Sequence, residues 1–323
     1  MVDDLGRHID YLRVSVTDRC NLRCVYCMPE GGVPSLRHED ILQFEEIARI
    51  VRVMTGLGIR HVRLTGGEPM ARRGCLDLVR ELSALPAVES VAMTSNGILL
   101  RDRVGEARDA GLTALNLSLD TLRPETYARM TRGGDVNAVL QTMEQAIAAG
   151  LRVKLNVVPV RGCNDDELTE LAMLAKDRPV CVRFIELMPL GCARALHPIP
   201  QDEVLARLRE AFGTMEEDLA PHGHGPARYW KPEGFAGSVG MIGALSHTFC
   251  ADCNRVRLTA DGRLKLCLNH TKGLDLRALL RGGTSDAELE AAIREAVKTK
   301  PECHGFGASV ADREARRMNE IGG

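Results

Sequence analysis

Short apolar runs rich in β-branched residues alternate with helical stretches from residue 11 to about residue 190, and this alternation restricts the fold more than any other feature. The predicted strands cover residues 12–16, 61–65, 88–94, 114–119, 153–158 and 180–187, and the predicted helices cover residues 44–56, 75–84, 101–110, 136–149 and 165–176. Alternation at this spacing predicts parallel β/α units with right-handed crossovers. The sequence therefore predicts an α/β fold with six such units.

Polar motifs follow the carboxyl ends of these predicted strands. They are residues 65–69 (TGGEP), 94–97 (TSNG), 118–120 (SLD), Pro159 and residues 186–189 (ELMP). In a barrel all of these ends point to one rim and converge on one site, whereas an open, doubly wound sheet would spread them along an edge. We therefore predict a partial (β/α)6 barrel of the TIM type.

The pattern changes after about residue 195, where prolines become frequent and residues 222–225 (HGHG) are typical of a loop. Residues 228–268 predict short antiparallel strands with a hairpin turn at Asp261-Gly262. Two helices are predicted over residues 274–280 and 286–298. The sequence thus predicts two parts, a barrel over residues 1–195 and a C-terminal extension over residues 196–323.

Three thiols, Cys20, Cys24 and Cys27, lie close together on the loop after the first predicted strand. Three soft thiolates at this spacing suit an iron–sulfur cube in which one iron has no protein ligand. The spacing differs from the C-x2-C-x2-C run of ferredoxins and from the paired C-x2-C knuckles of structural zinc sites. Because an open iron can bind and activate a substrate, we predict a catalytic cluster here. Zinc or reduced structural thiols are the alternatives.

A second set of thiols, Cys250, Cys253 and Cys267, lies in the C-terminal part. It again contains three thiols without a fourth, and it predicts a second cluster with an open iron. Zinc is the alternative, since His247 or His270 could complete a tetrahedron.

Several cationic side chains lie within predicted strands. Arg255 and Arg257 are two residues apart and therefore share one strand face, where paired guanidiniums suit phosphate oxygens. Arg13, Arg63 and Lys154 have apolar neighbours, so they are expected to face the barrel interior. Cations gathered there would repel one another without an anionic ligand. The pattern favours a polyphosphate substrate, with a solvated strand face as the alternative for Arg255 and Arg257.

The composition disfavours several classes of protein. Over 323 residues the formal net charge is −2 and aromatic residues make up 3 %, which argues against nucleic-acid binding. Eleven cysteines without a secretory leader predict a reducing compartment, and we expect a cytoplasmic protein. No apolar run is long enough to cross a bilayer, so no membrane association is predicted.

The loop from Cys20 to Cys27 resembles the radical S-adenosylmethionine (SAM) superfamily, whose hallmark is this C-x3-C-x2-C spacing. The resemblance implies that the amino and carboxylate groups of SAM chelate the open iron, and that one electron cleaves the sulfonium to release a 5′-deoxyadenosyl radical. Tyr26 matches the aromatic position near the adenine. Gly66-Gly67-Glu68 matches the GGE motif, which contacts the amino group of SAM. A core tyrosine and a simple turn are the structural alternatives.

Motifs along nearly the whole chain are similar to the GTP 3′,8-cyclase family of molybdenum-cofactor biosynthesis. They are residues 13–20 (RVSVTDRC), 27–29 (CMP), 63–69 (RLTGGEP), 183–188 (RFIELM), 250–258 (CADCNRVRL) and 321–323 (IGG). Ser95 stands where this family often has a threonine, and Met70-Ala71 departs from its usual pair.

The resemblance to this family implies two [4Fe–4S] clusters and SAM as cofactors, and GTP as substrate. The implied cluster ligands are Cys20, Cys24 and Cys27 for the first cluster and Cys250, Cys253 and Cys267 for the second; the implied SAM contacts are Tyr26, Gly67, Glu68, Ser118, Arg183 and Met188; the implied GTP contacts are Arg13, Arg63, Thr94, Lys154, Arg255 and Arg257. The first three cysteines, Arg255 and Arg257 are the implied catalytic residues. Gly322-Gly323 matches a tail that reaches into the active site.

The implied reaction removes the hydrogen from C3′ of GTP and joins C3′ to C8, which gives 3′,8-cyclo-7,8-dihydro-GTP. A cyclic pyranopterin monophosphate synthase would consume the product, flavodoxin or ferredoxin would supply electrons, and the chain would act as a monomer or homodimer. One alternative is another radical SAM enzyme with an auxiliary cluster, such as a peptide-modifying maturase. The other is a non-enzymatic binding module stapled by iron–sulfur or zinc.

Overall fold

The computed structural model describes residues 1–306 and 314–322, and one twelve-stranded sheet in the order β12-β11-β10-β1-β2-β3-β4-β5-β6-β9-β8-β7 lies at its centre. The strands are β1 (Tyr11–Ser15), β2 (His61–Thr65), β3 (Ser90–Ser95), β4 (Leu112–Ser118), β5 (Arg152–Val157), β6 (Val180–Ile185), β7 (Met215–Glu217), β8 (Arg228–Pro232), β9 (Ser238–Ile242), β10 (Arg255–Leu258), β11 (Arg263–Lys265) and β12 (Gly273–Asp275). The helices are α1 (Phe44–Gly56), α2 (Cys75–Ser83), α3 (Val104–Asp109), α4 (Pro124–Thr131), α5 (Val136–Ala148), α6 (Leu168–Met173), α7 (Gln201–Phe212), α8 (Leu276–Arg281), α9 (Asp286–Lys298) and α10 (Met318–Ile321). The short 3-10 helices are η1 (His38–Asp40), η2 (Pro69–Ala71), η3 (Arg101–Arg103) and η4 (Gly191–Ala195).

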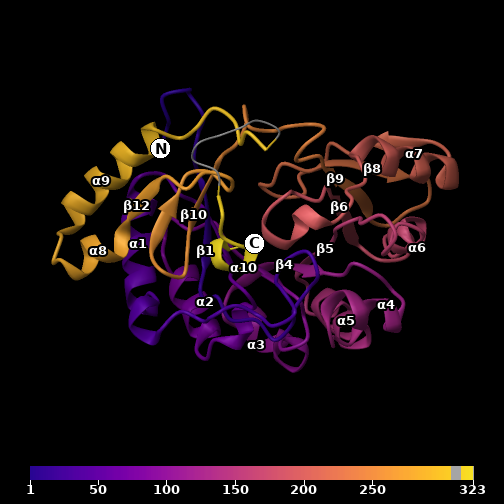
Figure 1. The fold of residues 1–323 in the computed structure, drawn as a ribbon, viewed down its shortest axis with the longest axis horizontal. Helices are drawn as coiled ribbons and strands as arrows, with labels where there is room; N and C mark the ends of the chain where they lie inside the picture. The colour runs from indigo at the N-terminus through magenta and orange to yellow at the C-terminus, as the bar shows by residue number, and fades with distance from the viewer. Residues whose placement is uncertain (307–313, 323) are drawn as a thin grey trace.

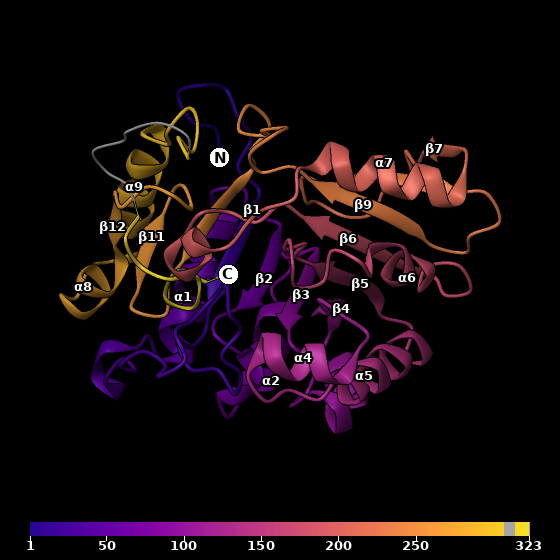
Figure 2. The same ribbon diagram turned by 45° about the vertical axis from the view of Figure 1, so that its right-hand side comes forward.

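Strands β1 to β6 are parallel and adjacent in chain order. Because right-handed crossovers that all run in one direction place every connecting helix on the same side, α1 to α6 form an arc outside the strands (Figures 1 and 2). A doubly wound sheet reverses its strand order, so it does not describe this chain. The order confirms the predicted α/β class and agrees with the predicted partial barrel.

The predicted strands β1 to β6 are all present, with bounds that differ by at most two residues. The helix predicted over residues 165–176 is shorter, because the carboxylate of Glu167 accepts hydrogen bonds from Thr121 and Leu122 in a preceding loop. Helices α4, α7 and α10 lie where the sequence analysis predicts no element. The buried side chains of Tyr127 and Met130 hold α4 in place, a tertiary contribution that local sequence does not reveal.

The sequence predicts antiparallel strands over residues 228–268, and this prediction is wrong for two of them. β9 pairs in parallel with β6, and β10 pairs in parallel with β1. β8, β11 and β12 do add in antiparallel fashion, and the predicted turn at Asp261-Gly262 lies between β10 and β11. The parallel partners of β9 and β10 lie far away in the chain, so the local sequence pattern could not identify them. The C-terminal part extends the barrel sheet at both edges, and the division near residue 195 stays a prediction.

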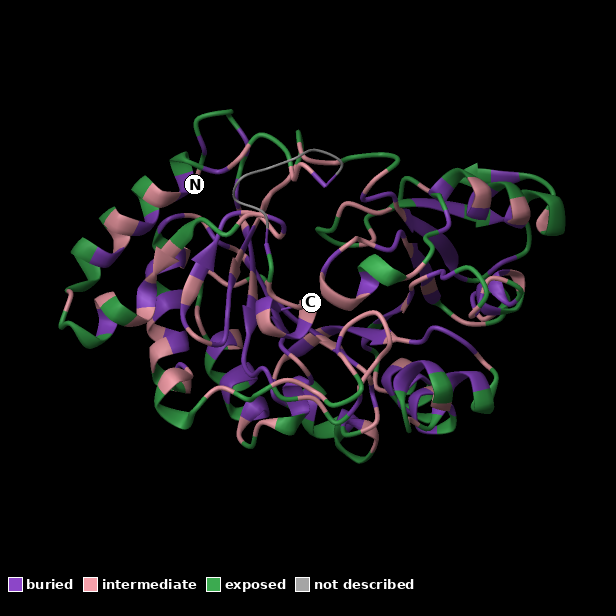
Figure 3. Ribbon diagram, in the orientation of Figure 1, coloured by how far each residue is buried: buried purple, intermediate pink, exposed green. Residues whose placement is uncertain are grey.

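Alternation along the strands sorts side chains between the two faces of the sheet. Leu12 and Val14 of β1 belong to the hydrophobic core, so Arg13 lies on the opposite, inner face. The register places Arg13 beside Arg63 of β2 and Arg257 of β10. Figure 3 shows the strands and the helix sides that face them as buried. Among the described helices, none is both long and apolar enough to span a bilayer.

Arg7 ties the N-terminal segment to the C-terminal part. Its side chain is 5 % exposed, and its Nε donates to the buried carboxylate of Asp3 at 2.6 Å. Its guanidinium also donates to the carbonyls of Cys250, Lys300 and Pro301 at 2.9, 3.0 and 2.9 Å. A residue near the start of the chain thereby fixes the loop that carries the second set of thiols.

Replacing Arg7 by alanine (Arg7→Ala) should lower the free energy of unfolding by roughly 3–5 kcal/mol, because it leaves the Asp3 carboxylate buried without its partner. Urea unfolding followed by circular dichroism measures the loss. The control is Arg37→Ala, which removes an exposed ion pair with Glu39 and should cost less than about 1 kcal/mol. Equally small losses in both variants would contradict this role of Arg7.

Candidate active site

Helix α4 holds the loop that carries the first set of thiols. The amides of Arg23 and Val25 donate to the carbonyls of Thr131 and Met130 at 3.0 and 2.9 Å. These bonds join the loop to the last turn of α4, in the β/α unit after β4. The loop therefore does not depend on a metal alone for its backbone conformation.

The three thiols of this loop influence one another. Burial raises the pKa of Cys24, and the charges of Cys27 and Cys20 raise it further. Burial and the charge of Cys20 raise the pKa of Cys27 to about 12. Thiolates gathered here are unfavourable without a cation, and ligation by iron supplies positive charge while it displaces the thiol protons. The donor set therefore fits an iron–sulfur cluster.

The Gly66-Gly67-Glu68 turn after β2 packs directly against the start of the thiol loop. The amides of Gly67 and Glu68 donate to the carbonyls of Thr17 and Arg19 at 2.7 and 2.8 Å. A Cβ on Gly67 would collide with the carbonyl oxygen of Arg19. The paired glycines thus let two backbones approach closely. This structural role stands beside the predicted contact of Gly67 with SAM, which stays a prediction.

The carboxylate of Glu68 is fully buried, and burial raises its pKa. It accepts hydrogen bonds from the amide of Met70 at 3.1 Å, the hydroxyl of Ser95 at 2.8 Å and the amide of Asn96 at 2.8 Å. The side chain of Asn96 in turn donates to Asn21 of the thiol loop at 2.8 Å. Glu68 therefore joins the ends of β2 and β3, and its predicted contact with SAM is a further role that stays a prediction.

Tyr26 is fixed by a carboxylate at the end of β4. Its hydroxyl donates to Asp120 Oδ2 at 2.6 Å, and Asp120 Oδ1 accepts from the amide of Val158 at 2.8 Å. Burial raises the pKa of Asp120 to about 6. No role was predicted for Asp120, although its place in the strand-end motif 118–120 was the signal that could have identified it.

A cavity of about 260 Å³ brings three groups of predicted residues together. It is lined by Tyr26, Ser118 and Met188 from the SAM set, by Arg13, Thr94, Arg255 and Arg257 from the GTP set, and by the second thiols Cys250, Cys253 and Cys267. The remaining predicted residues do not line it: they are Cys20, Cys24, Cys27, Gly67, Glu68, Arg63, Lys154 and Arg183. The two predicted ligand sites therefore share one space.

Cations on the inner face of the barrel depress one another's pKa. Burial, followed by the charges of Arg183 and Arg63, lowers the pKa of Lys154 to about 7. Burial and the charge of Arg255 lower the pKa of Arg257 to about 10. Their acceptors include uncharged groups: the Tyr11 hydroxyl for Arg63, the His222 carbonyl for Lys154 and the Asn156 side-chain amide for Arg183. A bound polyanion would relieve this repulsion.

The C-terminal segment enters the barrel interior, where Figure 1 shows α10 and the chain end. The Nη1 of Arg257 donates to the carbonyl of Gly322 at 2.8 Å. Earlier in the segment, buried Glu314 forms an ion pair with buried Lys265. The predicted tail therefore reaches a residue of the GTP set at Gly322, and Gly323 lies outside the described residues.

The second set of thiols has two cationic neighbours, Lys300 and Arg255, that act on Cys253. Burial by itself would raise the pKa of Cys253, but the charges of Lys300 and Arg255 outweigh it and lower that pKa to about 7. Lys300 lines the same cavity and was not predicted. It follows the end of α9, and no motif in the sequence marks it.

The histidines that could complete a zinc site have other partners. His247 lies 2.8 Å from Asp202, and His270 lies 3.1 Å from the carbonyl of Cys303. In residues 1–306 and 314–322, no three His, Cys, Asp or Glu side chains are arranged around a single metal ion. A cube differs from such a site because it binds each thiolate through a different iron.

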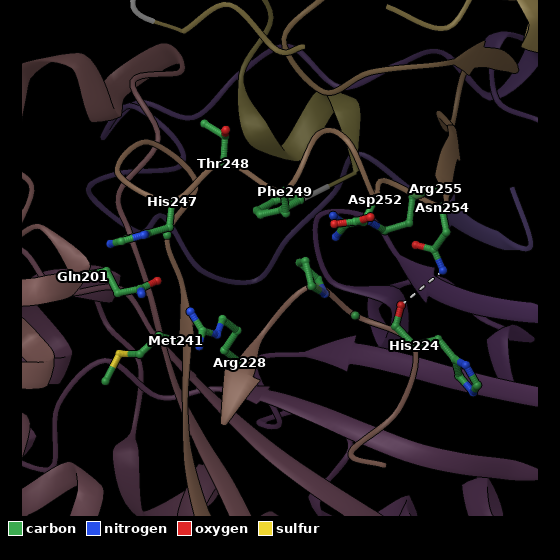
Figure 4. A pocket seen from close by; sticks show the side chains of 13 residues that line it. Gln201, His224, Arg228, Met241, His247, Thr248, Phe249, Asp252, Asn254 and Arg255 are labelled. Carbon is green, nitrogen blue, oxygen red and sulfur yellow. Dashed lines mark hydrogen bonds between the residues drawn. The ribbon is translucent and has the colours of Figure 1, made fainter. Parts of the chain in front are cut away.

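A wider cavity of about 580 Å³ lies beside the first one (Figure 4). Arg255 and Phe249 line both cavities, and the Arg255 guanidinium lies 4.9 Å from the centre of the Phe249 ring. Next to Arg255, Asn254 donates to the carbonyl of His224 at 3.4 Å (Figure 4). Arg255 thus stands at the boundary between the two spaces.

Comparison with known proteins agrees with this arrangement. A family model described as the Radical SAM superfamily matches residues 14–175, and one described as Molybdenum Cofactor Synthesis C matches residues 180–306. The crystal structure of Streptococcus suis SuiB bound to S-adenosylmethionine superposes with a TM-score of 0.61 at 14 % identity, over 90 % of this chain and 68 % of that one. Fold and family model together define a radical SAM protein.

Two relatives make the assignment narrower. The GTP 3′,8-cyclases of Pelotomaculum thermopropionicum and Moorella thermoacetica are each 46 % identical to this chain, over the full length of both partners. The chain belongs to the GTP 3′,8-cyclase family. This membership confirms the resemblance predicted from the motifs, and with it SAM and two [4Fe–4S] clusters as the cofactors.

Adding a methyl group at Gly67 (Gly67→Ala) should lower the free energy of unfolding by roughly 1–3 kcal/mol, because the turn and the thiol loop must move apart. Iron bound after anaerobic reconstitution should fall as well, since the displaced loop carries the three predicted ligands of the first cluster. Chemical unfolding and iron analysis measure the two effects.

The matched control is Gly105→Ala, in α3, where an added Cβ meets nothing within 4 Å. This change should preserve the iron content and raise stability by about 0.5–1 kcal/mol, because alanine favours a helix over glycine. A Gly67→Ala protein as stable and as rich in iron as the control would refute the close approach.

Proposed function

We propose that this chain converts GTP into 3′,8-cyclo-7,8-dihydro-GTP, the first step of molybdenum-cofactor biosynthesis. The single observation that carries the proposal is the central cavity, in which part of the predicted SAM set, part of the cationic set and the second set of thiols face one space. Membership of the GTP 3′,8-cyclase family supports the same reaction. When bound, the first cluster and SAM supply a 5′-deoxyadenosyl radical that removes the hydrogen from C3′ of GTP.

The residues of the chain position these groups. Cys20, Cys24 and Cys27 hold the first cluster at the barrel rim. Tyr26, Gly67, Glu68, Ser118, Arg183 and Met188 contact SAM. Cys250, Cys253 and Cys267 would hold the second cluster, which would supply an iron without a protein ligand for the guanine.

The cations of the interior hold the triphosphate. Arg13, Arg63, Thr94, Lys154, Arg255 and Arg257 contact GTP. Register supports this grouping, because Arg13 is the direct neighbour of both Arg63 and Arg257 across the sheet. Their mutual repulsion falls when the anionic phosphates bind, so part of the binding free energy comes from relieving it. Arg257 also bonds to the carbonyl of Gly322, which supports a tail that senses the same ligand.

The wider setting follows from this chemistry. Residues 1–195 form the radical-generating part and residues 196–323 the part that carries the second cluster. The eleven cysteines, free throughout the structure, support work in a reducing compartment such as the cytoplasm. Flavodoxin or ferredoxin supplies electrons to a monomer or homodimer, and a cyclic pyranopterin monophosphate synthase takes up the product.

A peptide-modifying radical SAM enzyme fits the observations less well. SuiB shares the fold, yet its 14 % identity carries no information on substrate. A row of three neighbouring guanidiniums on the inner face suits a polyphosphate better than a peptide backbone. The observations therefore favour a GTP cyclase over a peptide-modifying maturase.

Anaerobic incubation with SAM, GTP and dithionite should give 5′-deoxyadenosine and the cyclised nucleotide, identified by mass spectrometry. Reconstituted protein should contain about eight iron and eight sulfide per chain. The Cys24→Ala variant should give neither product, because the first cluster loses a ligand. The control is Cys75→Ala, at a buried cysteine that begins α2, and it should retain both products. A chain that bound only zinc, or that cleaved SAM without changing GTP, would contradict the proposal.

Replacing Arg257 by alanine (Arg257→Ala) should weaken GTP binding by roughly 1.5–3 kcal/mol, the range for a charge-assisted hydrogen bond. Isothermal titration of the anaerobic holoenzyme measures the change, and cleavage of SAM with dithionite should survive. Arg263→Ala, on the adjacent strand β11, is the control and should leave the affinity unchanged. An unaltered affinity in Arg257→Ala would show that this guanidinium does not hold the phosphates.

A further inference from the structure

Lys300 places a buried positive charge beside the second set of thiols. Its residue is 5 % exposed and lines the central cavity together with Cys250, Cys253 and Cys267. Its Nζ donates to the carbonyls of Arg255 at 2.9 Å and Leu266 at 2.6 Å. Arg255 lies two residues after Cys253, and Leu266 directly precedes Cys267. One ammonium therefore joins the two chain segments that carry these thiols.

The position of this ammonium is set from both sides. The amide of Lys300 donates to the carbonyl of Val297 at the end of α9, and its own carbonyl accepts from Arg7 at 3.0 Å. Helix α9 packs its buried Leu289, Ile293 and Val297 inward. The backbone of Lys300 is therefore fixed, and its side chain can leave the thiols only by breaking the two hydrogen bonds of its Nζ.

The countercharge of Lys300 is supplied by sulfur. Within the described ranges no carboxylate forms an ion pair with its Nζ. Burial lowers the pKa of Lys300, and the neighbouring Cys253 and Cys267 are the groups that oppose this by favouring its charged form. Lys265, the neighbouring buried lysine, has by contrast its own carboxylate in Glu314. A buried cation without a carboxylate is costly unless another anion is present.

A cluster provides that anion. Three thiolates on a [4Fe–4S] core leave a net negative charge, and one-electron reduction makes it more negative. A fixed cation at close range favours the more negative state, so hydrogen bonds and charges around the sulfurs set the reduction potential.

We propose that Lys300 is a positioning residue of the second cluster, which joins the segments of Cys253 and Cys267 and raises the reduction potential of the cluster by its charge. This inference rests on the proposed function only in that a second cluster is present. It adds a determinant of potential that acts from outside the ligand set. The charge of Lys300 also affects the two clusters differently, because Lys300 lies beside the second set of thiols and not beside the first.

The test is an EPR-monitored potentiometric titration of the reconstituted holoenzyme, in which added SAM identifies the signal of the first cluster. In Lys300→Met, which keeps the volume and removes the charge, the midpoint of the second cluster should shift to a more negative potential while that of the first does not move. In Lys300→Arg, which retains the charge, the shift should be much smaller. Lys298→Met, at an exposed lysine on the same segment, should leave both midpoints in place.

Each outcome decides the question. An unchanged midpoint in Lys300→Met overturns the inference. Loss of the second cluster in both Lys300→Met and Lys300→Arg, seen as about four iron instead of eight, also overturns it, because the charge would then not be what matters. Loss of the second cluster in Lys300→Met, together with its retention in Lys300→Arg, supports the inference. Failure of the proposed function would appear in the unmodified chain, as absent iron or absent cyclised product, before any variant is compared.

Discussion

Repulsion between cations inside the barrel is the constraint on which the site depends. Arg13, Arg63 and Arg257 occupy neighbouring positions on three strands, and Lys154 adds a fourth charge with a pKa lowered to about 7. A folded chain tolerates such a cluster of like charges only where the surrounding structure holds it in place. Here the hydrophobic core behind β1 and β2 does so. An anionic ligand then binds to charges that are already in place, so little reorganisation opposes binding.

The strand ends at the barrel rim serve structure and ligand chemistry together. Glu68 illustrates this, because its carboxylate joins two strand ends through three hydrogen bonds from the chain. The glycine before it permits the turn to touch the thiol loop. Asp120 orients Tyr26 in the same way from the end of β4. The residues that the family resemblance assigns to SAM therefore also assemble the rim, so a substitution there is expected to change both.

Local patterns were enough to predict strands β1 to β6 and to show that their ends converge. Period and capping act over a few residues, so they can be read from sequence. The parallel pairing of β9 and β10 could not be read, because their partners β6 and β1 are set by the sheet as a whole. Arg7 and Cys250, 243 residues apart, show the same limit within the site. Contacts at that separation exist only after the chain has folded.

The two sets of thiols differ in the charge that surrounds them. Burial and neighbouring thiols raise the pKa of Cys24 and Cys27, whereas Lys300 and Arg255 lower that of Cys253 to about 7. Arg255 belongs at once to the surroundings of the second thiols and to the residues that face the cavity. Because one guanidinium cannot fully compensate two anions, a phosphate bound at Arg255, as proposed, would weaken the effect of this residue on the thiolates beside it. The proposed substrate and the second cluster would then be coupled through the charge of Arg255.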